Sequence, residues 1–432
     1  MKPKSLTRLR QADDRTLHFL PGGFGIGMRF TAAGAARYQQ KVVAGITLHP
    51  DVGDGTRQSF EMLRTVWAYG VLCYEIFTLV GDHALLVIEQ ALRERFMRHV
   101  QGVLVFVDRG GAEHTIAVAS YDDVFEASKT ARRHRWQLRA VPGQPPIAFN
   151  AMLDGLRRWA REVGLLRGHR NRVIEQALAD LRNAVAHPAG PHLGSPVDAA
   201  RKLDDIAEII NQLWGHPTPG GRLYPAPIRR QPVAIGWTDD PYESRMGLAE
   251  YLHPDDEEHT GWQWVIVRAS YEPELGWGDS DLFAFDSRHE VTRLPVELLW
   301  GPGRRTDAIA WFTANQPQPD VVDPLDRMFI VRHEGPRLWL PMRPQIVAAL
   351  PATDQFGTWY AIACDDPMSA WRHTSNLVAG TVCNQERPCT GCGVHTVLVG
   401  DYAEVAALCP AAAGPLPADV RTPRAHPRWR EV

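Results

Sequence analysis

The chain has 432 residues, of which 44% are hydrophobic and 22% are charged, and its formal net charge is -3. This ordinary globular balance argues against a disordered chain, and the length predicts two domains, because single cores usually stop growing at about 250–300 residues. The longest apolar run, residues 66–74, is too short to span a bilayer, and the basic N-terminus lacks the apolar core of a secretory signal. We therefore expect a cytoplasmic protein with no membrane-spanning segment.

Charge is segregated along the chain. Residues 129–182 contain twelve Lys or Arg and four Asp or Glu, a net charge of +8. Residues 239–286 contain two basic and thirteen acidic residues, a net charge of -11. Such a pattern fits a polyanion-binding surface gated by an acidic segment, but it fits two solvated faces as well.

The N-terminal half predicts helices around a small β insert. Residues 1–60 carry short apolar runs broken by glycines, which predicts an irregular or β-containing lead-in. Over residues 61–100 apolar side chains recur at helical spacing, which predicts one long helix, or two with a break at Gly81. Apolar runs at 103–107 and 115–118 flank Gly110-Gly111 as in a β-hairpin, so we expect an insert at about 102–145.

Helical periodicity returns after the insert. Asn150 is a typical N-cap residue, and a further helix is expected at about 171–187. Residues 195–198, Ser-Pro-Val-Asp, supply an N-cap, a proline at the first helical position and an acidic third residue, and the helix that they begin should end near Trp214-Gly215. Residues 61–215 are therefore expected to form an α-helical bundle that contains the insert.

The C-terminal half changes in character. Proline and glycine dominate residues 216–232, and together with the acidic residues that follow they predict a linker over 216–262. Beyond it, short β-branched or aromatic runs separated by turn signals predict an antiparallel β-rich domain over 263–432. The predicted fold class is α+β: an N-terminal helical bundle with a small β insert, followed by a β-rich C-terminal domain.

Arg182, Asn183 and His187 place a guanidinium, an amide and an imidazole at the end of one predicted helix. Asn183 and His187 lie four residues apart on one face, and the Arg182 side chain is long enough to reach round the edge. Because Pro188 disfavours helical geometry for His187, the imidazole should lie at the helix C-terminus, where the macrodipole favours its protonated form. RNA cleavage by internal transesterification needs these groups: an imidazole to move protons near neutral pH and a guanidinium to hold the phosphate.

This motif resembles that of the HEPN ribonuclease family, in which an arginine is followed by a polar residue, often asparagine, and by a histidine four to six positions after the arginine. The resemblance extends to segments 87–96 and 209–214 and covers about residues 61–215. It implies a metal-independent endoribonuclease with Arg182, Asn183 and His187 in the active site, which leaves a 2',3'-cyclic phosphate and a 5'-hydroxyl. Glu89 could orient a catalytic group, although an exposed helix glutamate is the simpler interpretation.

The resemblance also implies partners. Family members usually dimerise so that two motifs face each other, and they are common in toxin and antiphage systems. We therefore expect RNA as substrate, a homodimer formed through the bundle, and an antitoxin or defence-system protein as a further partner. Because some HEPN domains keep the motif yet only bind RNA or assemble, the alternative is a non-catalytic dimerisation or RNA-binding module in a sensor or scaffold protein.

Residues 389–393, Cys-Thr-Gly-Cys-Gly, have the spacing of a zinc knuckle, in which two thiolates separated by two residues hold one ion over a glycine-rich turn. Structural zinc needs four ligands, and the candidates for the other two are Cys383 and Cys409, with His395 as an alternative and Cys364 as a more remote one. A second Cys-x-x-Cys pair is missing, so these cysteines could also be unmetallated. We expect structural zinc at Cys383, Cys389, Cys392 and Cys409, and no cofactor for catalysis.

Overall fold

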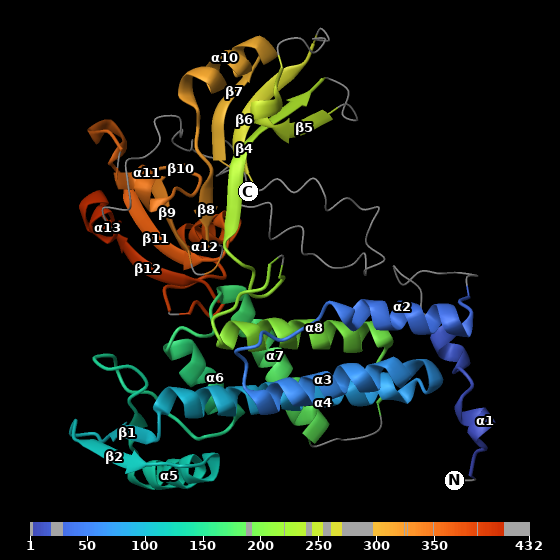
Figure 1. Ribbon diagram of the computed structural model, residues 1–432. Helices are drawn as coiled ribbons and strands as arrows, with labels where there is room; N and C mark the ends of the chain where they lie inside the picture. Colours follow the sequence, from blue (N-terminus) through green and yellow to red (C-terminus); the bar gives the residue numbers. More distant parts are fainter. Residues whose placement is uncertain are drawn as a thin grey trace. The chain divides into compact units, whose positions relative to one another are not determined.

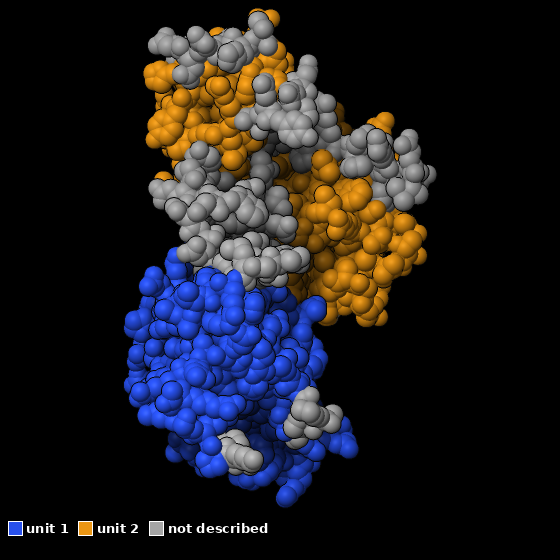
Figure 2. All heavy atoms as spheres, turned by 90° about the vertical axis from the view of Figure 1, so that its right-hand side faces the viewer, with its two compact units in different colours: residues 1–167, 171–226, 276–286 blue, residues 168–170, 227–275, 287–432 orange. Residues whose placement is uncertain are grey.

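The computed structural model describes residues 3–18, 29–186, 192–219, 221–238, 244–253, 261–269, 297–323, 325, 327–348, 350–386 and 388–409. They form two compact units (Figure 1 and Figure 2). Unit 1 takes its described residues from 1–167 and 171–226, and unit 2 from 168–170 and from 227 onward. The boundary after residue 226 therefore falls inside the expected linker.

Unit 1 is mainly helical. Its elements before the β insert are helix α1 (Leu6–Leu9), the 3-10 helix η1 (Asp14–His18), α2 (Ala32–Ala44), α3 (Asp54–Trp67), the 3-10 helix η2 (Ala68–Leu72) and α4 (Glu75–Val100). After the insert come α6 (Leu153–Glu162), α7 (His169–Ala186), which belongs to unit 1 from Asn171 on, and α8 (Pro196–Leu213). The long helix α4 contacts α3, α6 and α8, so it is the centre of the helical packing (Figure 1).

Helix α4 runs unbroken through Gly81, where the sequence allowed for a break. A Cβ at Gly81 would lie 3.4 Å from the Cβ of Ala199 on α8, so the glycine lets the two helices approach closely. Helix α8 begins as expected: the Ser195 side chain accepts a hydrogen bond from the Asp198 N–H, and Pro196 occupies the first turn. Its apolar face, which includes Leu203, is buried.

The N-terminal segment differs from the irregular or β-containing lead-in that we expected. In its described parts, 3–18 and 29–60, it contains helices and no strand. The Thr31 side chain caps α2 by accepting from the Gly34 N–H, and the Trp67 indole on α3 donates to the Gln39 carbonyl on α2 at 2.8 Å. The glycines at 22–27 that suggested turns lie outside the described residues.

The insert is a small α/β element. Strands β1 (Val103–Val107), β2 (Glu113–Ala117) and β3 (Gln137–Leu138) form an antiparallel sheet of order β2-β1-β3, and α5 (Tyr121–His134) connects β2 to β3. The expected hairpin around Gly110-Gly111 is confirmed, with Val105 opposite Thr115. A capping box between Ser120 and Asp123 begins α5, which the sequence analysis did not predict.

The described residues of unit 2 form two antiparallel sheets. The first has the order β5-β4-β6-β7, with β8 also paired to β4. Its strands are β4 (Ile228–Trp237), β5 (Ser244–Leu248), β6 (Gln263–Ala269), β7 (Glu297–Gly303) and β8 (Asp320–Val322), with the 3-10 helix η3 (Ala249–Tyr251) after β5 and α10 (Arg305–Asn315) after β7.

Strands β4 and β5 lie within residues 216–262, so the prediction of a linker throughout that segment was wrong. The sequence analysis missed β4 because residues 216–232 are rich in proline, which is typical of a linker. Pro232 lies opposite Arg268 of β6 but precedes Val233, the first residue in register with β5, and such a position tolerates a residue without an N–H.

The second sheet has the order β10-β9-β11-β12. Its strands are β9 (Arg327–Glu334), β10 (Arg337–Leu338), β11 (Thr358–Cys364) and β12 (His395–Gly400), and its helices are α11 (Pro344–Ala348), η4 (Ala352–Asp354), α12 (Pro367–Ala379) and α13 (Tyr402–Leu408). Ile330 and Trp359 belong to one apolar cluster and Phe329 and Tyr360 to another, because neighbouring residues of a strand point to opposite faces. Helices α11 and α13 contribute to the first cluster and α12 to the second (Figure 1).

The described fold is therefore mixed α/β, with three antiparallel sheets in the described ranges, and its C-terminal unit carries helices as well as strands. None of the helices in the described part of the chain is both long enough and apolar enough to cross a membrane.

Candidate functional site

The first candidate site joins α4 to the C-terminal end of α7 in unit 1. Glu89 on α4 is buried, with 6% of its side chain exposed, and its two carboxylate oxygens accept hydrogen bonds from Arg93 and Arg182. The Arg182 side chain, 20% exposed, also donates from Nη1 to the Asn183 side-chain oxygen at 3.3 Å. The interpretation of Glu89 as an exposed helix residue was therefore wrong.

A buried carboxylate is costly unless it is paired and hydrogen-bonded, and two guanidinium groups meet that requirement here. The pairing holds the Arg182 side chain against α4. A guanidinium has five N–H donors, and the bonds to Glu89 and Asn183 use two of them. Arg182 therefore keeps donors that could bind a phosphate.

The insert is tied to the same group of side chains. The Arg93 guanidinium lies over the Tyr121 ring of α5, 4.8 Å from its centroid. The Tyr121 hydroxyl donates to the Ala151 carbonyl at 2.7 Å, and burial raises the pKa of this hydroxyl. A continuous row of contacts thus runs from Tyr121 through Arg93 and Glu89 to Arg182.

His187, the third residue of the predicted motif, lies outside the described residues. Helix α7 is described as far as Ala186, so the expected helix end at His187 also lies outside the described residues. Asn183 is exposed on the last turn of α7. Within the described chain, the structure therefore brings together Glu89, Arg182 and Asn183.

Some of the basic side chains in residues 129–182 form ion pairs with acidic side chains of the same unit. Arg161 makes two hydrogen bonds to the buried Glu175, at 2.8 and 3.0 Å, and the Tyr224 hydroxyl donates to the same carboxylate. Arg158 pairs with Asp154. The hydrogen bonds to Glu175 join α6, α7 and the segment after α8, whereas the Arg158–Asp154 pair lies within α6. The acidic segment at 239–286, the expected gate, lies largely outside the described residues.

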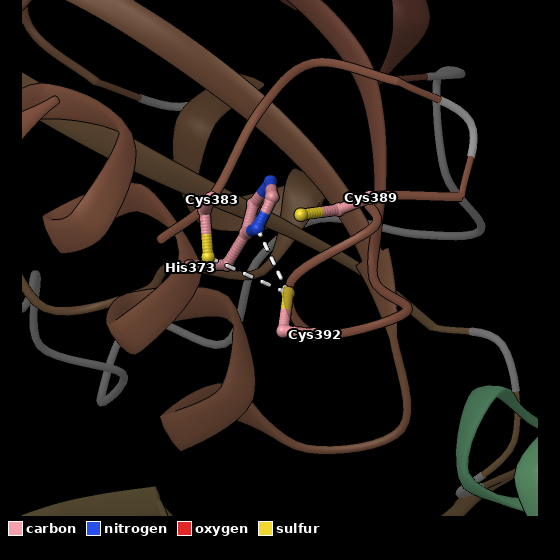
Figure 3. A group of neighbouring side chains, drawn as sticks. All are labelled: His373, Cys383, Cys389 and Cys392. Atoms are coloured by element: carbon pink, nitrogen blue, oxygen red, sulfur yellow. Dashed lines mark hydrogen bonds between the residues drawn. The ribbon is translucent and has the colours of Figure 1, made fainter. Parts of the chain in front are cut away.

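The second candidate site is a group of metal-ligand side chains in unit 2: His373 on α12 and Cys383, Cys389 and Cys392 in the segment between α12 and β12 (Figure 3). Their ligand atoms all lie within 4.8 Å of one another. His373 Nδ1 lies 3.1 Å from Cys392 Sγ, which lies 3.7 Å from Cys383 Sγ. Three of the four residues are buried and Cys392 is exposed, so the group could hold a metal ion.

The other expected ligands lie elsewhere. Cys409 belongs to the apolar cluster around Ile330, and its thiol donates to the Val405 carbonyl at 3.4 Å. Cys364 belongs to the opposite cluster, and His395 on β12 is not among the four grouped residues. Contrary to the expected set, neither Cys409 nor His395 is grouped with the other three cysteines, and the fourth member of the group is His373.

Sequence reasoning missed His373 because it precedes Cys383 by ten residues, across a helix end, and no fixed spacing marks it. One signal was available. His373 lies three residues after Ala370 and four before Leu377, so it shares the core-facing side of α12 with them. Burial lowers the pKa of His373, which favours the neutral imidazole that binds metals.

A third group, His49, Asp51 and His216 in unit 1, also places three ligand atoms within 4.8 Å of one another. The two imidazole rings stack with centroids 3.4 Å apart, and His216 Nε2 lies 2.9 Å from an Asp51 oxygen. These residues are more exposed than the cysteine group. The sequence analysis did not predict this group.

Comparisons with protein-family models, with curated proteins and with solved structures found no match for this chain. Its function is therefore argued from the geometry of its own residues.

Replacing Glu89 by Gln should destabilise unit 1 by about 3 kcal/mol, the lower end of the cost of breaking a buried ion pair, because Arg182 remains partly exposed. The matched control is Glu61→Gln on α3, which removes an ion pair to Arg64 from a carboxylate that is 64% exposed and should cost less than about 1 kcal/mol. Hydrogen exchange of the α4 amides measures both effects. Equal protection in the two variants would show that the Glu89 pair does not hold α4 and α7 together.

Proposed function

We propose that unit 1 is a metal-independent endoribonuclease domain of HEPN type, with Arg182, Asn183 and His187 in its active site. The observation that carries the proposal is the buried Glu89 carboxylate, which holds Arg182 beside Asn183 on the last turn of α7. His187 follows directly after that turn. The placement of Arg182 beside Asn183 supports the proposal, because both side chains could then reach one phosphate.

The chemistry would proceed by internal transesterification. The RNA 2'-hydroxyl attacks the adjacent phosphorus, the bond from phosphorus to the 5'-oxygen breaks, and the products are a 2',3'-cyclic phosphate and a 5'-hydroxyl. His187 would take the proton of the 2'-hydroxyl or supply one to the leaving 5'-oxygen. Arg182 would hold the phosphate as charge develops, and Asn183 would orient the phosphate or the imidazole. Glu89 would act through Arg182, as a positioning residue.

This reaction needs no metal ion, so we assign the group of three cysteines and His373 no part in it. An ion with four protein ligands has no open position for water or substrate. We propose that the ion of this group is zinc and that its role is structural.

We propose that the domain acts as a homodimer and that α7 contributes to the interface. Val173 is 69% exposed, and Ala177, Leu181 and Ala184 are exposed on the same side of the helix. Exposed apolar side chains at this spacing form a stripe that a second copy of the chain could cover. The stripe runs beside Arg182 and Asn183, so a two-fold interface there would bring two motifs together.

A toxin or antiphage effector, controlled by an antitoxin or another defence-system protein, is the biological role that we propose for this activity. The alternative is a module that dimerises and binds RNA without cleaving it. The ion pair between Arg182 and Glu89 favours this alternative, because it gives the Arg182 guanidinium a structural role. RNA binding and dimerisation without any cleavage would establish it.

Replacing His187 by Ala should slow RNA cleavage by about 10²- to 10⁴-fold, because it removes general acid or base catalysis. RNA binding should persist, and wild-type cleavage should survive EDTA. The matched control is His192→Ala, which removes an exposed histidine paired with Asp82 and should cleave at the wild-type rate. Product ends and rates on total cellular RNA provide the measurement. Cleavage that is unchanged in His187→Ala, or abolished by EDTA, would refute the assignment.

Replacing Val173 by Lys should convert the dimer to a monomer, because it places a charge in the apolar stripe of α7. Cleavage should fall with it, since each site is expected to need two motifs. Leu79→Lys on α4 is the control, since Leu79 is 64% exposed and lies away from α7 in the sequence. Light scattering at micromolar concentration measures the mass. A wild-type monomer that cleaves RNA at full rate would contradict the dimer.

A further inference from the structure

We propose that unit 2 contains a closed zinc site whose four ligands are Nδ1 of His373 and the thiolates of Cys383, Cys389 and Cys392, and that this ion joins α12 to the segment between α12 and β12. The inference stands apart from the ribonuclease proposal. It rests on residues of unit 2 alone, and its readout is metal binding.

The spacing of the ligand atoms fits one tetrahedral ion. With Zn–S bonds of about 2.3 Å and a Zn–N bond of about 2.0–2.1 Å, tetrahedral angles place two sulfurs about 3.8 Å apart and a nitrogen and a sulfur about 3.6 Å apart. The distance from Cys383 Sγ to Cys392 Sγ is 3.7 Å, and that from His373 Nδ1 to Cys392 Sγ is 3.1 Å. These two distances lie within about 0.5 Å of the tetrahedral values, and Figure 3 shows the four side chains directed toward one another.

The second nitrogen of His373 is already engaged. Its Nε2 lies 2.8 Å from the hydroxyl oxygen of Thr396, a buried residue of β12. If Nε2–H donates to that oxygen, the lone pair of Nδ1 faces the three sulfurs. Histidines that bind metals in proteins are usually fixed by such a hydrogen bond from the other ring nitrogen. A Thr396 hydroxyl that accepts from Nε2–H would leave Nδ1 free to bind the ion and would hold the ring in this orientation.

Two of the sulfur atoms also accept hydrogen bonds from N–H groups of the protein. The Asn384 backbone N–H points to Cys389 Sγ at 3.4 Å, and the Asn376 side-chain amide points to Cys383 Sγ at 3.6 Å. Hydrogen bonds from groups outside the ligand set help to orient the ligand atoms toward an ion. All six cysteines of the chain are free, so no disulfide competes for these thiols in the structure.

The turn that presents Cys389 and Cys392 depends on glycine. A Cβ at Gly391 would lie 2.2 Å from the Val382 carbonyl oxygen, and Gly393 has a φ of +73°. Both positions therefore exclude ordinary side chains. This turn is the tight knuckle that two cysteines separated by two residues need in order to hold one ion.

The task of the ion follows from what surrounds it. Between the end of α12 at Ala379 and the start of β12 at His395, the described residues form no helix or strand. His373 comes from the core-facing side of α12, whereas the three cysteines come from this irregular segment. A four-ligand site would therefore fasten the segment to α12 and, through Thr396, to β12. With no open coordination position, the site serves the fold.

Elemental analysis of the full chain, purified without chelator, should find about one zinc per chain. His373→Ala and Cys389→Ser should lose it. Cys409→Ser and His395→Ala, which remove the ligands that spacing alone suggested, should retain it. His216→Ala removes the other candidate metal group, in unit 1, and should also retain it. Absence of zinc from the wild type, or its persistence in both His373→Ala and Cys389→Ser, would overturn the proposal.

A second variant keeps the test decisive if those proteins fail to fold. Thr396→Val removes only the hydrogen-bond partner of His373 and should weaken zinc binding by about 10- to 100-fold in competition with a chromophoric chelator. Thr374→Val is the matched control, because this buried threonine on α12 donates its hydroxyl hydrogen bond to the Ala370 carbonyl and not to a proposed ligand atom. Cobalt(II) in the wild-type site should show thiolate charge-transfer bands and tetrahedral d–d bands. Equal zinc affinity of the two threonine variants, or an octahedral cobalt spectrum, would contradict the ligand set.

Discussion

The candidate ribonuclease site depends on one constraint, the burial of the Glu89 carboxylate on α4. A negative charge removed from water must be compensated, and the chain supplies Arg93 from the next turn of α4 and Arg182 from the end of α7. The need to compensate the buried Glu89 charge therefore also orients the guanidinium of Arg182. Because Arg93 also lies over Tyr121, the position of the insert is coupled to the same carboxylate.

Two parts of unit 2 differ in how they can be stabilised. The sheet of β9 and β11 is covered on both faces by helices, and apolar burial is sufficient to hold it. The segment before β12 has no helix or strand in its described residues and contributes few apolar side chains to either cluster. The zinc ion that we propose at the cysteine and histidine group would stabilise this segment, because metal binding contributes directly to folding free energy.

Local signals predicted part of this structure. The cap at Ser195 and the hairpin at Gly110-Gly111 each depend on neighbouring residues, and the sequence sufficed to find them. Burial of Glu89 could not be predicted, because a partner 93 residues away decides it. His373 was missed for a similar reason: the helix end between it and Cys383 hides their proximity. Strand β4 was missed because Pro232 resembles a linker residue, and only its place in the register makes it tolerable.

The most direct test of the account is a double-mutant cycle on the rate of RNA cleavage, with Glu89→Gln and Arg182→Lys. If Glu89 acts through Arg182, each single variant should slow cleavage, and the double variant should be no slower than the more impaired single variant. Cleavage losses that multiply in the double variant would show that the two residues act independently. A wild-type protein that cleaves no RNA would contradict the central claim itself.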